Sequence, residues 1–188
     1  SKNLQTICDT EEDMKLALHI IAKDEVEQVK RICQQYGGYF DEIAVAVDDK
    51  FEEFEKLQYD YEKLHIHRYK WCDDFAHKRN WLAERTKCQY YLRMDTDDEI
   101  GDPQNIRKVF DESVAGHIDT VYVPYIYATD KDGNVEAEHW RETIIRKDKN
   151  FYWKKEIHEN IFVEDVSQYR ASKDNRIRII HNKPEEDF

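Results

Sequence analysis

Apolar runs that alternate with helix-like stretches constrain the fold of this chain more than any other feature of its sequence. Four runs have the composition of buried strands, at residues 16–22, 41–47, 64–69 and 90–94. Stretches with apolar residues at helical spacing separate them, at about 25–36, 50–58 and 75–84. This order predicts an α/β fold with a mostly parallel central sheet, flanked by helices and joined by right-handed crossovers.

The pattern changes after Pro103. One helix is expected at about 104–115, and strand-like runs follow at 120–127, 141–146, 151–153 and 176–180. The dipeptide Asp132-Gly133 is a hairpin signal between the first two of these runs. The second half is therefore expected to be a mixed or antiparallel extension of the first. Because no linker, repeat or low-complexity tract interrupts the chain, residues 1–188 are expected to form a single domain.

The balance of charge excludes several kinds of partner. Charged residues make up 37% of the chain and the formal net charge is −12, which argues against nucleic-acid binding and against electrostatic docking on an anionic membrane. No apolar run approaches the roughly 18 residues of a spanning segment, so no integral membrane segment is expected. The four cysteines are widely spaced without a CxxC pair, which favours reduced thiols and a cytoplasmic protein.

The densest group of acids follows the fourth apolar run directly, within Asp95–Glu99. Carboxylates this close repel one another and favour a bound cation, and ligands bind at strand ends in open α/β sheets. An EF-hand is excluded because Ile100 and Ile106 occupy the loop positions that require Gly and Glu. An aspartyl phosphotransferase is chemically possible but has no clear support. A nucleotide-sugar transferase remains, in which two acids hold a cation that bridges the donor diphosphate.

Six segments carry a resemblance to a known family. In chain order they are Ile20-Ile21-Ala22-Lys23-Asp24-Glu25, Asp41 to Asp48, Asp74 to Asn80, Met94-Asp95-Thr96-Asp97-Asp98-Glu99, Trp153 with Ile157-His158-Glu159, and Ile179-Ile180-His181. Together they resemble the inverting glycosyltransferases of family 2, and the fourth resembles that family's DxD motif. The resemblance covers about Leu16 to His181 and implies the GT-A fold. The chain departs from the family after Asp48, where a Gly-Ser-x-Asp-x-Thr turn is usual.

The resemblance implies a role for each matching residue. The nucleotide would be bound by Ala22, Asp48, Arg79, Asp95 and Thr96. The metal ligands would be Asp95, Asp97 and His181, with Asp97 as the principal one. Glu159 would be the general base that deprotonates the acceptor hydroxyl. The resemblance leaves Asp98 without a role. Arg141 and Arg146 are candidates for phosphate binding but are expected to be exposed strand residues. Trp71, Trp140 and Trp153 are candidates for stacking on a sugar or base but are expected to serve core or loop packing.

The implied function is metal-dependent, inverting transfer of a sugar from a nucleotide-diphosphate donor to an acceptor hydroxyl. A UDP-sugar is the favoured donor, Mn²⁺ or Mg²⁺ the cofactor, and a glycan, a lipid-linked molecule or a protein the acceptor. Residues 16–102 would bind the nucleotide and residues 103–182 the acceptor. Two alternatives stay open. One is a non-catalytic module of the same fold that binds a nucleotide sugar or glycan. The other is a nucleotidyltransferase, although Lys23-Asp24-Glu25 is not the Gly-rich loop of that class.

Overall fold

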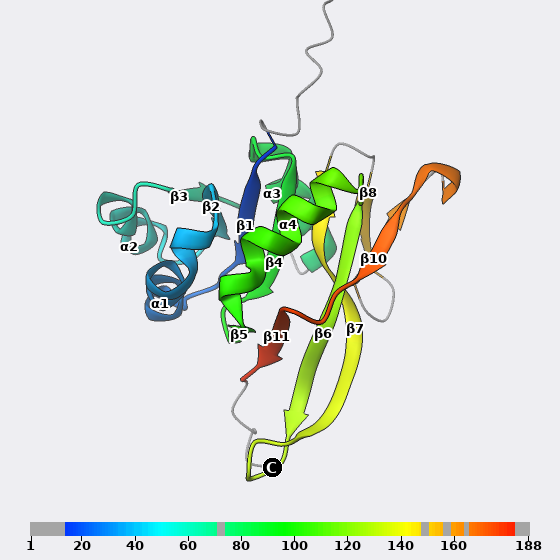
Figure 1. The fold of residues 1–188 in the computed structure, drawn as a ribbon. Coiled ribbons are helices and arrows are strands. Elements are labelled where there is room, and N and C mark those ends of the chain that lie inside the picture. The colour runs from blue at the N-terminus through cyan, green and yellow to red at the C-terminus, as the bar shows by residue number, and fades with distance from the viewer. Residues whose placement is uncertain (1–13, 71–73, 148–150, 156–158, 164–165, 183–188) are drawn as a thin grey trace, which may run out of the picture.

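The computed structural model describes residues 14–70, 74–147, 151–155, 159–163 and 166–182 (Figure 1). The main sheet has the strand order β3-β2-β1-β4-β7-β6-β11-β5, and β10 pairs with β6. Its strands are β1 Leu16–Ile21, β2 Glu42–Val47, β3 Leu64–Arg68, β4 Tyr90–Asp95, β5 Asp98–Gly101, β6 Thr120–Thr129, β7 Val135–Arg146, β10 Ala171–Lys173 and β11 Arg178–His181. A separate hairpin pairs β8 Phe151–Lys155 with β9 Glu159–Val163. The α-helices are α1 Val26–Tyr36, α2 Phe51–Lys56, α3 Phe75–Arg85 and α4 Ile106–Ala115.

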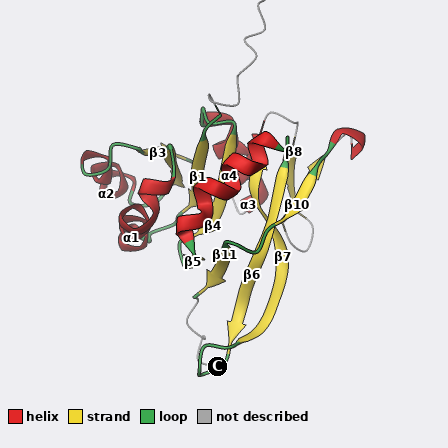
Figure 2. Cartoon of the chain, viewed as in Figure 1, coloured by secondary structure: helices red, strands yellow, loops and turns green. Residues whose placement is uncertain are grey.

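The predicted α/β class with a mostly parallel core is confirmed. Strands β3, β2, β1 and β4 are parallel to one another, whereas β7 runs antiparallel to β4 and to β6. Helices α1 and α4 lie on one face of the sheet and α3 on the other (Figures 1 and 2). The sheet is therefore covered on both faces, which is why its first strands are continuous apolar runs.

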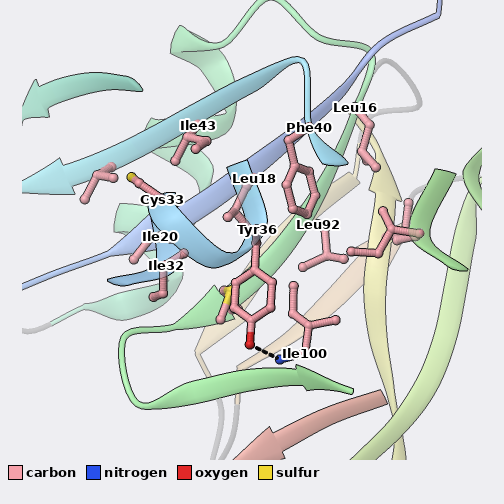
Figure 3. Close-up of a cluster of buried hydrophobic side chains, with 14 of the residues drawn as sticks. Leu16, Leu18, Ile20, Ile32, Cys33, Tyr36, Phe40, Ile43, Leu92 and Ile100 are labelled. Carbon is pink, nitrogen blue, oxygen red and sulfur yellow. Dashed lines mark hydrogen bonds between the residues drawn. The ribbon is translucent and has the colours of Figure 1, made fainter. Parts of the chain in front are cut away.

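The two faces of the sheet carry side chains of different size. On β1 and β2, the large residues Leu18 and Ile43 pack in the core beneath α1, as do their neighbours in Figure 3. The intervening alanines, such as Ala17 and Ala44, face α3. Because successive side chains of a strand point to opposite faces, this alternation lets α3 approach the sheet closely.

Helix α1 also supports the strand that follows the acidic turn. The backbone N–H of Ile100 on β5 donates a 3.0 Å hydrogen bond to the hydroxyl of Tyr36 at the end of α1 (Figure 3). Both residues are buried in the same apolar cluster. The position of β5, and of the acids at its start, is therefore tied to the core.

Several expected element boundaries are wrong. Strand β7 begins at Val135 rather than near residue 141, so β6 and β7 form a longer hairpin than the apolar runs indicated. Strands β5, β9 and β10 were not expected; β5 and β10 are only four and three residues long, too short to show periodicity. Among the described residues, no helix is long and apolar enough to cross a bilayer.

The tryptophans and cysteines have mixed outcomes. Trp153 is buried with 3% exposure, as expected, but Trp140 is 42% exposed and is not a packing residue of the core. Trp71 lies outside the described residues. Cys8 and Cys72 lie outside the described residues, and Cys33 and Cys88 are buried free thiols. Burial raises the pKa of both thiols to about 12, so neither is a reactive thiolate at neutral pH.

Candidate active site

The acidic turn between β4 and β5 is held by its own side chains. Strand β4 ends at Asp95 and β5 begins at Asp98, so Thr96 and Asp97 form the turn. The backbone N–H of Asp95 donates a 2.8 Å hydrogen bond to Oδ2 of Asp98. Strand β11 pairs antiparallel with β5 and places His181 directly opposite Asp98. The turn and the last strand thus bring residues from the middle and from near the end of the sequence to one point.

Three potential metal ligands meet there. One ligand atom from each of Asp97, Asp98 and His181 lies within 4.8 Å of the other two. Nδ1 of His181 is 3.1 Å from Asp98 and 3.8 Å from Asp97. Two carboxylates and one imidazole suit a divalent cation such as Mn²⁺, which accepts both oxygen and nitrogen ligands. The side chain of Asp97 is 34% exposed, so the group is open on one side.

The electrostatics of Asp98 favour a cation at this point. Asp98 is fully buried. Burial raises the pKa of Asp98 above its usual range, and the nearby carboxylate of Asp95 raises it further. The hydrogen bond from the Asp95 backbone and the contact with His181 lower this pKa, but by less. A positive charge beside a buried carboxylate stabilises its ionised form. Asp98, which the family resemblance left without a role, is therefore a full member of the candidate metal group.

Asp95 has a different environment. Its carboxylate lies 3.1 Å from Arg79 on α3 and 3.8 Å from Arg141 on β7. Burial disfavours its ionised form, but the guanidinium groups of Arg79 and Arg141 outweigh that effect and lower the pKa of Asp95. The expectation that Arg141 is an exposed strand residue is wrong, because its side chain is only 13% exposed. Asp95 is an anion neutralised by protein cations, next to the metal group.

Ala22 and Asp48, both expected to bind the nucleotide, lie close together. Both line a small hollow at the carboxyl ends of β1 and β2, together with Tyr69 and Lys78. Its volume is about 10 Å³, roughly the space of one water molecule. A nucleobase could therefore enter only if the surrounding side chains move.

Thr96 is held by its backbone. Its carbonyl oxygen accepts a 3.4 Å hydrogen bond from Nη2 of Arg31 on α1, which also donates to the carbonyl oxygen of Asp98 at 3.4 Å. The side chain of Thr96 is buried, with the residue 7% exposed. One arginine of α1 thus spans the turn and fixes the direction of its carbonyl groups.

Glu159 is the first residue of β9, where it pairs with Lys155. Its side chain lies outside the described part of the chain, as do Ile157 and His158. The other strand of this hairpin is attached to α3 through Asn80. The Asn80 side chain accepts a 2.7 Å hydrogen bond from the backbone N–H of Trp153 and donates a 3.0 Å bond to its carbonyl oxygen.

The indole ring of Trp153 joins the hairpin to the arginines beneath the site. Its Nε1 donates to the hydroxyl of Tyr91 at 3.0 Å. The guanidinium groups of Arg79 and Arg93 lie 5.6 Å and 4.4 Å from the ring centroid, within the range of cation–π attraction. The hairpin that carries Glu159 is therefore anchored beside Arg79, the residue that holds Asp95.

Comparison with known proteins identifies the fold. No family model and no curated protein matches the chain. Among solved structures, S. aureus TarS 1–349 superimposes with a TM-score of 0.61 at 12% identity, over 88% of this chain and 60% of that one. A further structure of S. aureus TarS gives 0.60 at 14% identity, over 93% and 38%. The mannosyltransferase PcManGT from Pyrobaculum calidifontis, in complex with GDP-Man and Mn²⁺, gives 0.63 at 8% identity, over 93% and 58%.

The present chain thus spans 60% or less of each of these structures. Identities of 8–14% carry information about the fold alone. The superpositions with TarS 1–349 and PcManGT cover 88% and 93% of this chain, so the likeness extends over most of its length. The chain has a GT-A-like α/β fold, which it shares with glycosyltransferases.

Proposed function

We propose that this chain is a metal-dependent, inverting glycosyltransferase domain of family 2 that uses a nucleotide-diphosphate sugar. The observation that carries the proposal is the group of Asp97, Asp98 and His181 at the carboxyl edge of a GT-A-like sheet. The GDP-Man and Mn²⁺ bound by PcManGT support a nucleotide sugar and a divalent cation. The proposal extends to a UDP-sugar as favoured donor, Mn²⁺ or Mg²⁺ as cofactor and a cytoplasmic location.

The metal group and the arginines Arg79 and Arg141 would both supply positive charge to the donor. Asp97, Asp98 and His181 would hold the cation, which when bound supplies positive charge to the donor diphosphate and improves it as a leaving group. Arg79 and Arg141 add positive charge beside this group in a chain whose net charge is −12. Such local cations attract an anionic donor despite the overall charge.

The ion pairs also preorganise Asp95. Because Arg79 and Arg141 keep its carboxylate ionised and fixed, Asp95 is a ready acceptor for a ribose hydroxyl. Asp48 and Ala22 would contact the nucleobase once the hollow between them opens. The backbone of Thr96, held by Arg31, would border the same donor.

Glu159 is the proposed general base. It would take the proton from the acceptor hydroxyl as the oxygen attacks the anomeric carbon. The new glycosidic bond forms while the bond from the anomeric carbon to the diphosphate oxygen breaks, so the configuration inverts. The attachment of the hairpin to α3 through Asn80 and Trp153 would keep this carboxylate in register with the donor.

Calorimetric titration with UDP and GDP, each with and without Mn²⁺, tests the proposal. Wild-type protein is expected to bind at least one of them only when Mn²⁺ is present. Asp97→Ala should abolish that metal-dependent binding, because it removes one of three ligands. Asp111→Ala, on the exposed face of α4, is the matched control and should bind as wild type does. If wild-type protein binds neither UDP nor GDP in Mn²⁺, the proposal is refuted.

A non-catalytic nucleotide-sugar or glycan binding module is the second candidate. The small volume of the hollow beside Asp48 and the absence of the family's Gly-Ser turn favour it. Donor hydrolysis separates the two. An enzyme is expected to release free sugar slowly from a UDP-sugar or GDP-sugar, and Glu159→Gln should stop that release without preventing nucleotide binding. Metal-dependent nucleotide binding with no hydrolysis or transfer would instead identify the binding module.

A further inference from the structure

Aromatic side chains form a row on one face of the β6–β7 hairpin, next to the candidate metal group. The hairpin extends beyond β11 and β5 at the carboxyl edge of the sheet (Figures 1 and 2). Tyr125 on β6 pairs with His139 on β7 on one side and with Ile179 on β11 on the other. Because side chains two residues apart in a strand share a face, His181 lies on the same face as Tyr125 and His139.

The rings of this row contact one another in sequence. The ring centroids of Tyr125 and Tyr127 are 6.4 Å apart and their planes differ by 20°. The His139 ring lies 5.3 Å from Tyr125 and 5.4 Å from Tyr127. At the inner end, the Tyr125 ring is 6.0 Å from the ring of His181. The row therefore runs without a break from a candidate metal ligand outward along the hairpin.

Tyr125, at the end of the row nearest the metal group, is also linked to Asp95 through Arg141. The guanidinium of Arg141 lies 4.4 Å from the centroid of the Tyr125 ring and 3.8 Å from the carboxylate of Asp95. Tyr125 is thus a fixed ring at the border of the candidate active site.

The outer end of the row is open to solvent. Tyr127 is 49% exposed, and His139 is also exposed. Exposed aromatic side chains that gather on one surface mark binding sites more often than single ones do. Each ring here has a polar atom at its edge and an apolar face. The row is therefore suited to a flat ligand with apolar faces and polar edges, rather than to an acyl chain, which needs an enclosed apolar pocket.

We propose that Tyr125, Tyr127 and His139 form the acceptor subsite, and that the acceptor is a neutral glycan whose pyranose rings stack on them. This inference rests on the proposed glycosyltransferase function and names its acceptor class. The C–H groups of a pyranose pack against aromatic faces while its hydroxyls reach water, tyrosine hydroxyls and imidazole nitrogens. A glycan laid from Tyr127 toward His181 presents its end to the metal group. The exposed acids Glu136 and Glu138 lie on the same hairpin, and their negative charge disfavours an anionic acceptor there.

Binding of tetrasaccharides to Tyr127 variants tests the subsite. Saturation-transfer NMR and titration would use cellotetraose, maltotetraose, mannotetraose and N-acetylchitotetraose with protein in Mn²⁺ and UDP or GDP. We expect wild-type protein to bind at least one of them, and Tyr127→Ala to weaken that binding about five-fold or more. Tyr127→Phe keeps the ring and should retain most of the affinity. The unfolding temperature of each variant checks that it folds.

Trp140→Ala is the matched control. Trp140 is 42% exposed on the same hairpin, but it pairs with Pro124 and faces the opposite side of the sheet, where Lys173 covers its ring at 5.3 Å. Its replacement should leave tetrasaccharide binding unchanged. Failure of all four tetrasaccharides to bind, or equal losses in Tyr127→Ala and Trp140→Ala, would overturn the inference.

The nucleotide titration keeps this test separate from that of the function. If UDP and GDP do not bind in Mn²⁺ but a tetrasaccharide binds and depends on Tyr127, the glycan subsite stands and the transferase proposal falls. If a nucleotide binds but no tetrasaccharide does, the transferase proposal stands and the subsite falls.

Discussion

Replacing Arg93 with Met tests how strongly burial determines the contribution of an ion pair in this protein. Nη2 of Arg93 lies 3.1 Å from Oε1 of Glu142, and Nε donates a 2.9 Å hydrogen bond to the Glu142 carbonyl oxygen. Their side chains are only 5% and 12% exposed. Arg107 and Asp41 form a pair of the same length, 3.1 Å, with side chains 40% and 33% exposed. The two pairs differ in burial and not in distance.

The expected costs follow from that difference. Removing one partner of a buried pair leaves an uncompensated charge and costs about 3–5 kcal/mol, whereas an exposed pair contributes about 0–1 kcal/mol. Burial lowers the pKa of Arg93 to about 9, and the charges of Arg141 and Arg79 contribute. Arg93 is therefore still charged at pH 7, and Glu142 loses a full positive partner in Arg93→Met.

Urea unfolding at pH 7 measures both effects. We expect Arg93→Met to lower the free energy of unfolding by about 3–5 kcal/mol and Arg107→Met to lower it by less than about 1 kcal/mol. The double variant Arg93→Met/Glu142→Leu should recover at least half of the loss, because it removes the stranded carboxylate as well. Losses in the two single variants that agree within about 0.5 kcal/mol would refute the argument from burial.

Two further predictions concern pH and the attachment of the β8–β9 hairpin. Burial lowers the pKa of His19 well below 6.5, with Lys147 contributing. The unfolded chain therefore binds a proton that the folded chain does not, and stability is lost as pH falls below about 6.5. Between pH 6.5 and 5 this loss is at most about 2 kcal/mol, and His19→Gln should remove it from the pH profile of urea unfolding; an identical profile would contradict the assignment. Asn80→Ala breaks both hydrogen bonds to the Trp153 backbone and should cost about 1–3 kcal/mol. It should also reduce donor hydrolysis more than nucleotide binding if Glu159 is the base, and equal losses of both would count against that role.

The sequence determined the elements of the first half because their signals are local. The strands β1, β2 and β4 are apolar runs, and a strand buried on both faces needs no partner information to be recognised. The acids of Asp95–Glu99 were likewise located at the end of a strand. The fold class followed from the alternation of these elements, and the structure confirms it.

The membership of the site was decided by tertiary structure. Asp98 meets His181 across 83 residues of sequence because β5 pairs with β11, and Arg141 reaches Asp95 because β7 pairs with β4. Tertiary structure also decided the burial of two tryptophans for which the sequence predicts packing: Trp153 is buried, whereas Trp140 is exposed. The period of a strand gives the alternation of its side chains, but strand register decides which of them meet. Register depends on contacts between distant segments, so the sequence alone could not assign Asp98 or Arg141 to the site.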